Sequence, residues 1–128
     1  MHVFQNKAFA RFADRNGISE EELCEAVRRA SRGLIDADLG GGVIKQRIAR
    51  KGEGKSGGFR SMILFRAEIR AVFVHGFAKK DMPNVDAAEL KALKKLAKVV
   101  LRYSDAEMAT TIAAGVFVEV KCHGKTVS

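Results

Sequence analysis

Three consecutive segments in the middle of the chain constrain the fold most, because each has the residue content of a β-strand. They span residues 43–50, 59–66 and 69–78. In the first, side chains alternate between two faces, with Ile44, Gln46 and Ile48 on one and Lys45, Arg47 and Ala49 on the other. Only Ala67 and Glu68 separate the second segment from the third, which is short enough for a hairpin turn. The sequence therefore predicts antiparallel strands, the first of which has a cationic face.

Helical segments flank these strands on both sides. Periodic apolar residues and capping signals predict helices over residues 6–16, 19–32, 86–100 and 104–115. Short strands are expected at residues 2–4 and 116–121, and Gly40-Gly41-Gly42 must form a turn or loop. We therefore expect a single α+β domain over residues 1–128, with a sheet covered mainly on one face and a flexible tail from about residue 123.

The positive charge is concentrated in the strand segments. The formal net charge is +8, and residues 43–80 contain ten Lys or Arg against only Glu53 and Glu68, an excess of eight. The rest of the chain therefore has no formal net charge. A field localised in this way suits a polyanion such as RNA, DNA or an acidic protein. A solvated basic face without function has the same composition.

Composition argues against several other classes of protein. Hydrophobic residues make up 47% of the chain, which is too many for a disordered protein. No apolar run reaches the ~18 residues of a membrane span, and the first ten residues lack the apolar core of a secretory signal. Cys24 and Cys122 are far apart in the sequence, so we expect free thiols in a reducing cytoplasm. Cys122 and His123 have no further ligands at suitable spacing, so no metal site is expected.

The glycine-rich loop at residues 52–58 raises the question of nucleotide binding. Gly54-Lys55-Ser56 matches the end of the phosphate-binding pattern GxxxxGK[ST]. The first glycine of that pattern would fall on Ala49, and a strand rather than a helix is expected to follow the loop. A phosphate would therefore meet no helix N-terminus. We expect the glycines instead to let the backbone turn and come close to a ligand.

Other catalytic arrangements find little support. No serine lies in a nucleophile elbow. His75, in the middle of an expected strand, is either a general acid or base or a half-buried strand residue. Asp36 and Asp38 lack a third ligand for a metal ion.

Cations on the three strands can converge on a phosphodiester if the strands are neighbours. The candidates are Lys45, Arg47, Lys55, Arg60, Lys79 and Lys80. Such a surface supports RNA cleavage without a metal, because a base can deprotonate the 2′-hydroxyl, cations can stabilise charge at phosphorus, and an acid can protonate the leaving 5′-oxygen. Arginine suits the phosphate clamp because it stays protonated, whereas a lysine among other cations loses its proton more readily. Composition alone does not separate cleavage from binding.

Four stretches, residues 44–50, 54–60, 76–80 and 84–93, resemble the RelE-like toxins of bacterial toxin–antitoxin systems, near the HigB branch. The resemblance covers roughly Ile18 to Val120, and residues 54–60 are its most specific part. It implies a RelE-like α+β fold, with a twisted antiparallel sheet, N-terminal helices on one face and C-terminal helices. It also implies a cytoplasmic, metal-independent endoribonuclease without a cofactor, which cuts mRNA, usually in the ribosomal A site, and inhibits translation under stress. The implied partners are mRNA, the ribosome and a helix-turn-helix antitoxin, through which alone operator DNA would be bound. No membrane is involved.

The resemblance assigns roles to individual residues. Lys45 and Arg47 correspond to the basic pair that includes the general base, Arg60 to the arginine that stabilises the pentavalent phosphate, and Lys79 to a residue that helps the leaving group. Further RNA or phosphate contacts are expected from Arg50, Lys51, Lys55, Arg66 and Lys80. Many relatives place a late tyrosine or histidine at the site. Here Tyr103 lies between two expected helices and His123 in the tail, so the acid is unassigned and His75 is a further candidate.

Two alternatives stay open. Some relatives in the wider RelE/ParE superfamily inhibit gyrase rather than cut RNA, so the chain is alternatively a toxin that acts by binding. A basic RNA-binding module is the third interpretation. The aromatic residues of the basic segment are expected mostly in the core, which weakens a base-stacking platform.

Overall fold

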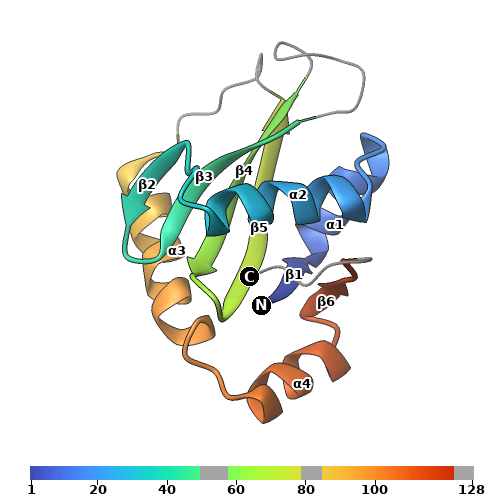
Figure 1. The fold of residues 1–128 in the computed structure, drawn as a ribbon. Coiled ribbons are helices and arrows are strands. Elements are labelled where there is room, and N and C mark those ends of the chain that lie inside the picture. Colours follow the sequence, from blue (N-terminus) through green and yellow to red (C-terminus); the bar gives the residue numbers. More distant parts are fainter. Residues whose placement is uncertain (50–57, 79–84, 123–128) are drawn as a thin grey trace.

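The computed structural model describes residues 1–49, 58–78 and 85–122. Its elements follow in the order β1 (His2–Asn6), α1 (Lys7–Arg15), α2 (Glu20–Ser31), β2 (Ala37–Gly40), β3 (Val43–Ile48), β4 (Phe59–Arg66), β5 (Arg70–Ala78), α3 (Ala87–Val100), α4 (Asp105–Ala113) and β6 (Phe117–Val120). Within these ranges the strands form one sheet in the order β2-β3-β4-β5-β1-β6 (Figure 1). None of the helices described is long and apolar enough to cross a membrane.

The three expected strands form the centre of the sheet. β3 pairs antiparallel with β4, and β4 pairs antiparallel with β5. β1 joins the other edge of β5 in parallel, because the long connection between these two strands permits parallel pairing. The sheet is thus mostly rather than wholly antiparallel. The sequence did not predict β2, whose Asp and Gly residues have low strand propensity; it pairs with the outer edge of β3.

Hydrogen bonds of capping residues decide where the helices begin. The Ser19 hydroxyl accepts from the N–H of Glu22 at 3.1 Å, and the Glu22 carboxylate accepts from the N–H of Ser19 at 2.9 Å. This capping box starts α2 as predicted. The other helices begin at caps of the same kind, formed by Asn6, by Asp86 and by Ser104 with Glu107.

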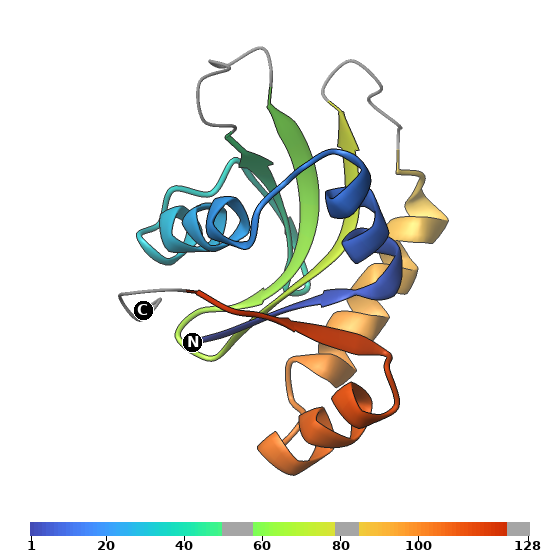
Figure 2. The same cartoon turned by 90° about the vertical axis from the view of Figure 1, so that its right-hand side faces the viewer.

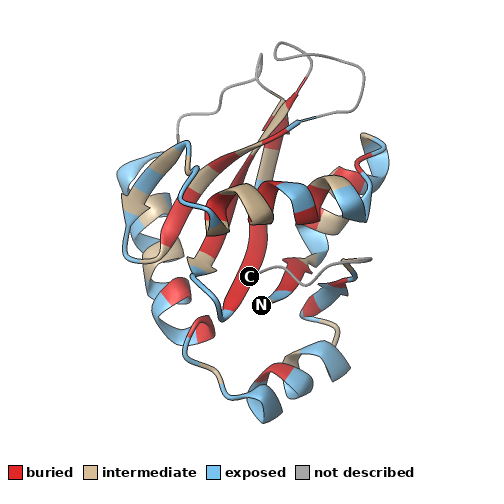
Figure 3. Cartoon of the chain, in the orientation of Figure 1, coloured by how far each residue is buried: buried red, intermediate tan, exposed pale blue. Residues whose placement is uncertain are grey.

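Helices cover both faces of the sheet, so the expectation of one covered face is wrong (Figure 2). On one face α1 and α2 pack over Ile44, Ile63 and Phe73. On the other, α3 and the start of α4 pack over Met62 and Leu64. The sequence contained the signal, because residues 62–64 and 71–74 are unbroken apolar runs, which are typical of strands buried on both sides. Figure 3 shows the resulting buried band along β4 and β5.

α1 lies close against β5 because Gly76 has no side chain. A Cβ atom there would lie 2.5 Å from ring atoms of Phe12 and 2.9 Å from the ring of Phe9. The Phe12 ring in turn meets Phe59 edge-on, with 5.6 Å between their centroids. This aromatic packing supports β4 and β5 at the end of the sheet where β4 begins.

Two arginines at the opposite end of the sheet hold the C-terminus of α3. Nη1 of the buried Arg70 donates to the carbonyls of Val100 and Tyr103, at 2.9 and 3.0 Å. Burial lowers the pKa of Arg70, an effect that the nearby Asp105 carboxylate opposes. Nη1 of Arg66 donates to the carbonyl of Leu101 at 3.1 Å. These bonds satisfy carbonyl groups that a helix end leaves free.

A disulfide joins Cys24 of α2 to Cys122, so the expectation of free thiols is wrong. The two Cα atoms are 5.7 Å apart, although 98 positions separate the residues in the sequence. Pairing of β6 with β1 brings the C-terminal segment to α2, where the N–H of Lys121 also donates to Glu20 at 2.8 Å. Sequence spacing carries no information about this contact, which depends on the sheet order.

We predict that reduction of the Cys24–Cys122 disulfide destabilises the protein. The cross-link closes a long loop and restricts the unfolded chain, so its loss should lower the free energy of unfolding by about 2–4 kcal/mol. Urea denaturation with and without dithiothreitol measures the change. A Cys122→Ser variant should show the same loss without reductant and no further loss with it. An unchanged midpoint for the reduced wild type would contradict the prediction.

Candidate functional site

Cations from β3 and β4 gather at one end of the sheet, on the face that α3 packs against. At this end β3 finishes, β4 begins and β5 finishes, near the top of Figure 1. Two rows of directly opposed residues cross the three strands there, Arg47–Arg60–Phe77 and Lys45–Met62–His75. The pairing register therefore brings Lys45, Arg47, Arg60 and His75 onto one surface, which we call the cationic end.

Arg47 and Arg60 form the centre of the cationic end. Directly opposed residues have Cβ atoms about 4.5–5.5 Å apart, and like charges in that arrangement repel. Nε of Arg47 and Nη1 of Arg60 are buried and have no hydrogen-bond partner within residues 1–49, 58–78 and 85–122. Buried donors without partners are costly. A ligand with several anionic oxygens, such as a phosphodiester, would supply partners to both guanidinium groups.

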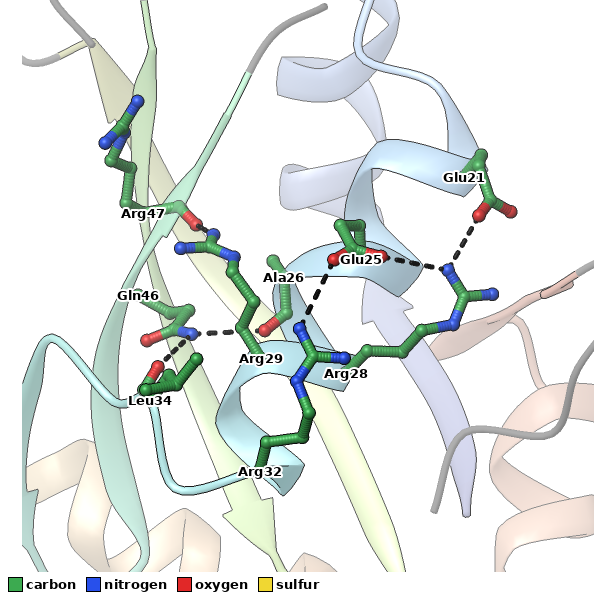
Figure 4. A network of polar contacts seen from close by, with 9 residues as sticks. All are labelled: Glu21, Glu25, Ala26, Arg28, Arg29, Arg32, Leu34, Gln46 and Arg47. Atoms are coloured by element: carbon green, nitrogen blue, oxygen red, sulfur yellow. Dashed lines mark hydrogen bonds and ion pairs between the residues drawn. The ribbon is translucent and has the colours of Figure 1, made fainter.

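Arg28 of α2 and Arg32 at its C-terminal cap, by contrast, have acidic partners. Arg28 contacts Glu21 at 2.7 Å and Glu25 at 3.3 Å, and Arg32 contacts Glu25 at 3.6 Å (Figure 4). The hydrogen bond to Glu21 raises the pKa of Arg28 against the opposing effect of burial. In the same view the guanidinium of Arg47 points away from these carboxylates. The charges of Arg28 and Arg32 are therefore compensated locally, whereas Arg47 has no acidic partner among the residues that the structure describes.

Side chains, rather than a neighbouring strand, form the hydrogen bonds to the outer edge of Arg47. β2 pairs with β3 only as far as Lys45. Beyond that point the Asp36 carboxylate accepts from the N–H of Arg47. The Arg29 guanidinium donates to the carbonyl oxygen of Arg47 (Figure 4). The position of Arg47 is thus fixed from α2 and from the segment before β2, while its own guanidinium stays unpaired in the described part of the chain.

The fully buried Gln46 completes this support. Its amide nitrogen donates to the carbonyls of Ala26 and Leu34, at 3.1 and 2.9 Å, and its oxygen accepts from the N–H of Asp36 at 3.0 Å. On the next strand the Ser61 hydroxyl donates to the Gln46 carbonyl at 2.8 Å. The sequence predicted the inward orientation of Gln46 but not its partners, because these come from α2 and the following turn.

Asp36 and Asp38 both take part in backbone hydrogen bonds. Asp36 binds Arg47, and the Asp38 carboxylate accepts from the N–H of Gly40 at 2.9 Å. Among the residues that the structure describes, no three His, Cys, Asp or Glu side chains lie close enough together to hold a metal ion.

Gly58 lets the chain enter β4 beside Arg47. A Cβ atom on Gly58 would lie 3.0 Å from the carbonyl oxygen of Ile48 and 3.4 Å from Nε of Arg47. A side chain there would crowd the guanidinium group. The last glycine of the glycine-rich loop thus keeps one side of Arg47 open.

A β-bulge places His75 in the cationic end. Met62 is opposite His75, but Ile63 is opposite Phe73, so Val74 is an extra residue in β5. Bulges redirect side chains and are common beside active sites. Here Val74 enters the core under α3, while His75 is exposed, with its ring 5.8 Å from that of Phe77. His75 is therefore not a half-buried strand residue.

A hollow of about 260 Å³ lies beside His75, between the sheet and the first turns of α3. It is lined by Met62, Val74, His75, Val85, Glu89, Ala92 and Leu93, so that all but His75 and Glu89 are apolar. The sequence offers no sign that Glu89 belongs to a site, since its position depends on how α3 packs on β4 and β5. We call this cavity the α3 hollow.

A second cationic surface runs along the other side of α3. A groove of about 890 Å³ lies between α3, the Gly41-Gly42 turn and the end of β4. Its lining contains six basic residues and no acidic one; the basic residues are Arg66, Lys91, Lys94, Lys95, Lys98 and Arg102. We call it the α3 groove.

The other residues predicted from the sequence either lie elsewhere in the described structure or fall outside it. Arg66 lies at the other end of β4 and borders the α3 groove. Tyr103 is partly buried against the core beneath α3 and α4. Arg50, Lys51, Lys55, Lys79, Lys80 and His123 lie outside the described residues.

Residues 1–120 match the family model described as the RelE toxin of the RelE / RelB toxin–antitoxin system. The chain belongs to the RelE toxin family. No curated protein matches it. The mixed α+β structure with its six-stranded sheet agrees with a RelE-like fold, which confirms the predicted fold class. RelE toxins pair with an antitoxin, so a cognate antitoxin is the expected partner of this chain. Membership of the HigB branch stays a prediction.

We predict that Gln46→Leu destabilises this RelE toxin. The change removes the hydrogen bonds of Gln46 to the Ala26 and Leu34 carbonyls and from the N–H of Asp36, which should lower the free energy of unfolding by about 2–4 kcal/mol in urea denaturation. Gln5→Leu is the matched control, because the buried Oε1 of Gln5 accepts no hydrogen bond within the described residues. Equal losses for the two variants would show that the hydrogen bonds of Gln46 contribute nothing.

Proposed function

We propose that this RelE toxin is an mRNA endoribonuclease that inhibits translation, and that the cationic end is its active site. The observation that supports this most is the direct opposition of Arg47 and Arg60 without acidic partners in the described part of the chain. Their guanidinium groups can bind the non-bridging oxygens of a phosphodiester and stabilise the charge that grows on them in the transition state.

The neighbouring row of opposed residues, Lys45–Met62–His75, is suited to proton transfer. Lys45 and His75 lie on β3 and β5, one on each side of Met62 on β4. Adjacent strands are about 4.8 Å apart, so the backbones of these two residues are separated by about 10 Å. In an in-line displacement the attacking and leaving oxygens are on opposite sides of phosphorus. A base on one outer strand and an acid on the other match that requirement.

The proposed reaction needs only these side chains. Lys45, in its neutral form, takes the proton of the 2′-hydroxyl, and the 2′-oxygen forms a bond to phosphorus. The bond from phosphorus to the 5′-oxygen breaks, and His75 in its charged form donates a proton to that oxygen. The products are a 2′,3′-cyclic phosphate and a free 5′-hydroxyl. Lys79, outside the described residues, is the other candidate for assisting the leaving group.

The α3 groove supports the ribosome-dependent form of this activity. Its six basic residues and absence of acidic ones suit the phosphate backbone of folded RNA, which dominates non-specific affinity. We therefore propose that the α3 groove contacts ribosomal RNA while the cationic end acts on mRNA. Both partners are cytoplasmic, where disulfides are rare, so the assays below include reductant.

Arg60→Ala should abolish toxicity and mRNA cleavage. Loss of one preorganised donor to the transition state should reduce the cleavage rate by about 100- to 1000-fold. The cleavage rate of Arg60→Lys should lie between those of the wild type and Arg60→Ala, because lysine keeps the charge without bidentate geometry. Growth and mRNA integrity after induction measure these effects, and Arg11→Ala, an exposed change on α1, is the control.

Two results would overturn the proposal. Growth arrest by the wild type with intact mRNA would indicate a toxin that acts by binding, such as a gyrase inhibitor. Absence of toxicity from a soluble, folded wild type would indicate a binding module.

Lys94→Gln combined with Lys98→Gln should weaken binding to ribosomes without affecting cleavage of free RNA. Each lost phosphate contact should reduce the slope of log affinity against log salt by about one. Sedimentation with ribosomes at several salt concentrations measures this slope. The control, Lys7→Gln with Lys121→Gln, removes the same charge from exposed residues near β1 and β6. An unchanged slope in the α3 variant would contradict a role for the groove.

A further inference from the structure

We propose that the α3 hollow binds a nucleobase of the RNA and selects bases that carry an amino group over uracil. This inference rests on the proposed nuclease function and adds a specificity subsite to it. The subsite joins residues of β4 and β5 to the first turns of α3, with Glu89 as the residue that reads the base.

The position of the hollow indicates which nucleotide it receives. His75 belongs both to the cationic end and to the lining of the α3 hollow. In the proposed reaction His75 protonates the leaving 5′-oxygen, which belongs to the nucleotide on the 3′ side of the cut. Along a strand, residues on one face repeat about every 7 Å, so this distance separates the row of His75 from the row of Arg60. A single nucleotide can span it. The base in the hollow is therefore that of the nucleotide that follows the cut.

The lining of the hollow suits a flat heterocycle. Met62 and Val74 come from the sheet, and Ala92 and Leu93 face them from α3. Single-stranded RNA is usually recognised through unstacked bases, which bind by apolar contact and by hydrogen bonds to their edges. Ligand sites of this kind are mostly apolar and contain a few polar groups that fix orientation.

Glu89 supplies the selectivity. An ionised carboxylate only accepts hydrogen bonds, and the exposed Glu89 side chain has no ion pair among the described residues. It can accept from the amino group of cytosine, and equally from those of adenine and guanine. Uracil would present a carbonyl oxygen at the same place, so that two acceptors would face each other. The adjoining cationic end favours an RNA occupant over an acidic antitoxin segment, which Glu89 would repel.

Cytidine and uridine 5′-monophosphate test the proposal directly. They differ only on one edge of the base, where cytosine has an amino group and an unprotonated N3, and uracil has a carbonyl oxygen and an N3–H; their 5′-phosphate corresponds to the scissile group. In NMR titrations the wild type should bind the cytidine nucleotide at least about fivefold more tightly. Glu89→Gln should make the two affinities nearly equal, because an amide both donates and accepts. Ala92→Leu, which fills the hollow from α3, should weaken binding of both.

The controls separate this subsite from the phosphate site. Glu119→Gln removes the same charge on the remote strand β6 and should keep the wild-type preference. Arg60→Ala should weaken both nucleotides equally. With RNA substrates that differ only in the base after the cut, the wild type should cleave most slowly before uracil, and Glu89→Gln should lose that difference.

Each result either supports or refutes one of the two proposals. Selective nucleotide binding without any RNA cleavage would refute the proposed nuclease and leave the subsite standing. Equal affinities in the folded wild type, or an unchanged preference in folded Glu89→Gln, would overturn the subsite. So would a Glu89→Gln variant that changes only the affinity for the antitoxin.

Discussion

The pairing register of β3, β4 and β5 is the constraint on which the rest of the structure depends. It places Arg47 opposite Arg60 and Lys45 in the same row as His75. Side chains alternate along a strand, so a slip of one residue would turn Lys45 and Arg47 into the core under α2 and expose Ile44 and Ile48. The hydrophobic core on that face therefore selects the register that creates the cationic end. Stability and the proposed function therefore depend on the same alignment.

Charge compensation divides the molecule into two kinds of surface. Arg28 of α2 and Arg32 at its end have carboxylate partners, and at the end of α3 Arg70 donates to backbone carbonyls. At the cationic end, Arg47 and Arg60 are directly opposed on neighbouring strands, and each has a buried nitrogen without a partner in the described structure. Such an arrangement costs stability unless a ligand supplies the missing acceptors. A protein that binds a phosphodiester would recover this cost on binding, whereas a solvated basic face would not.

α3 borders two of the surfaces described above and part of the hydrophobic core. One side of it closes the α3 hollow, the other borders the α3 groove, and its buried residues complete the second core. Its position depends on Arg66 and Arg70 at its C-terminal end and on Asp86 at its start. Because these contacts come from other parts of the chain, the amphipathic pattern of α3 alone does not predict the α3 hollow or the α3 groove.

Sequence alone determined the local features, because these depend on neighbouring residues. Capping boxes, strand alternation and the concentration of positive charge predicted where α2, α4 and β3 begin and which residues face outward. The resemblance to RelE toxins, carried by short motifs, was confirmed by the family match over residues 1–120. Tertiary structure alone decided the disulfide, the β-bulge at Val74, the partners of Gln46 and the place of Glu89. Each of these depends on contacts between segments far apart in the chain, and spacing in the sequence does not encode such distances.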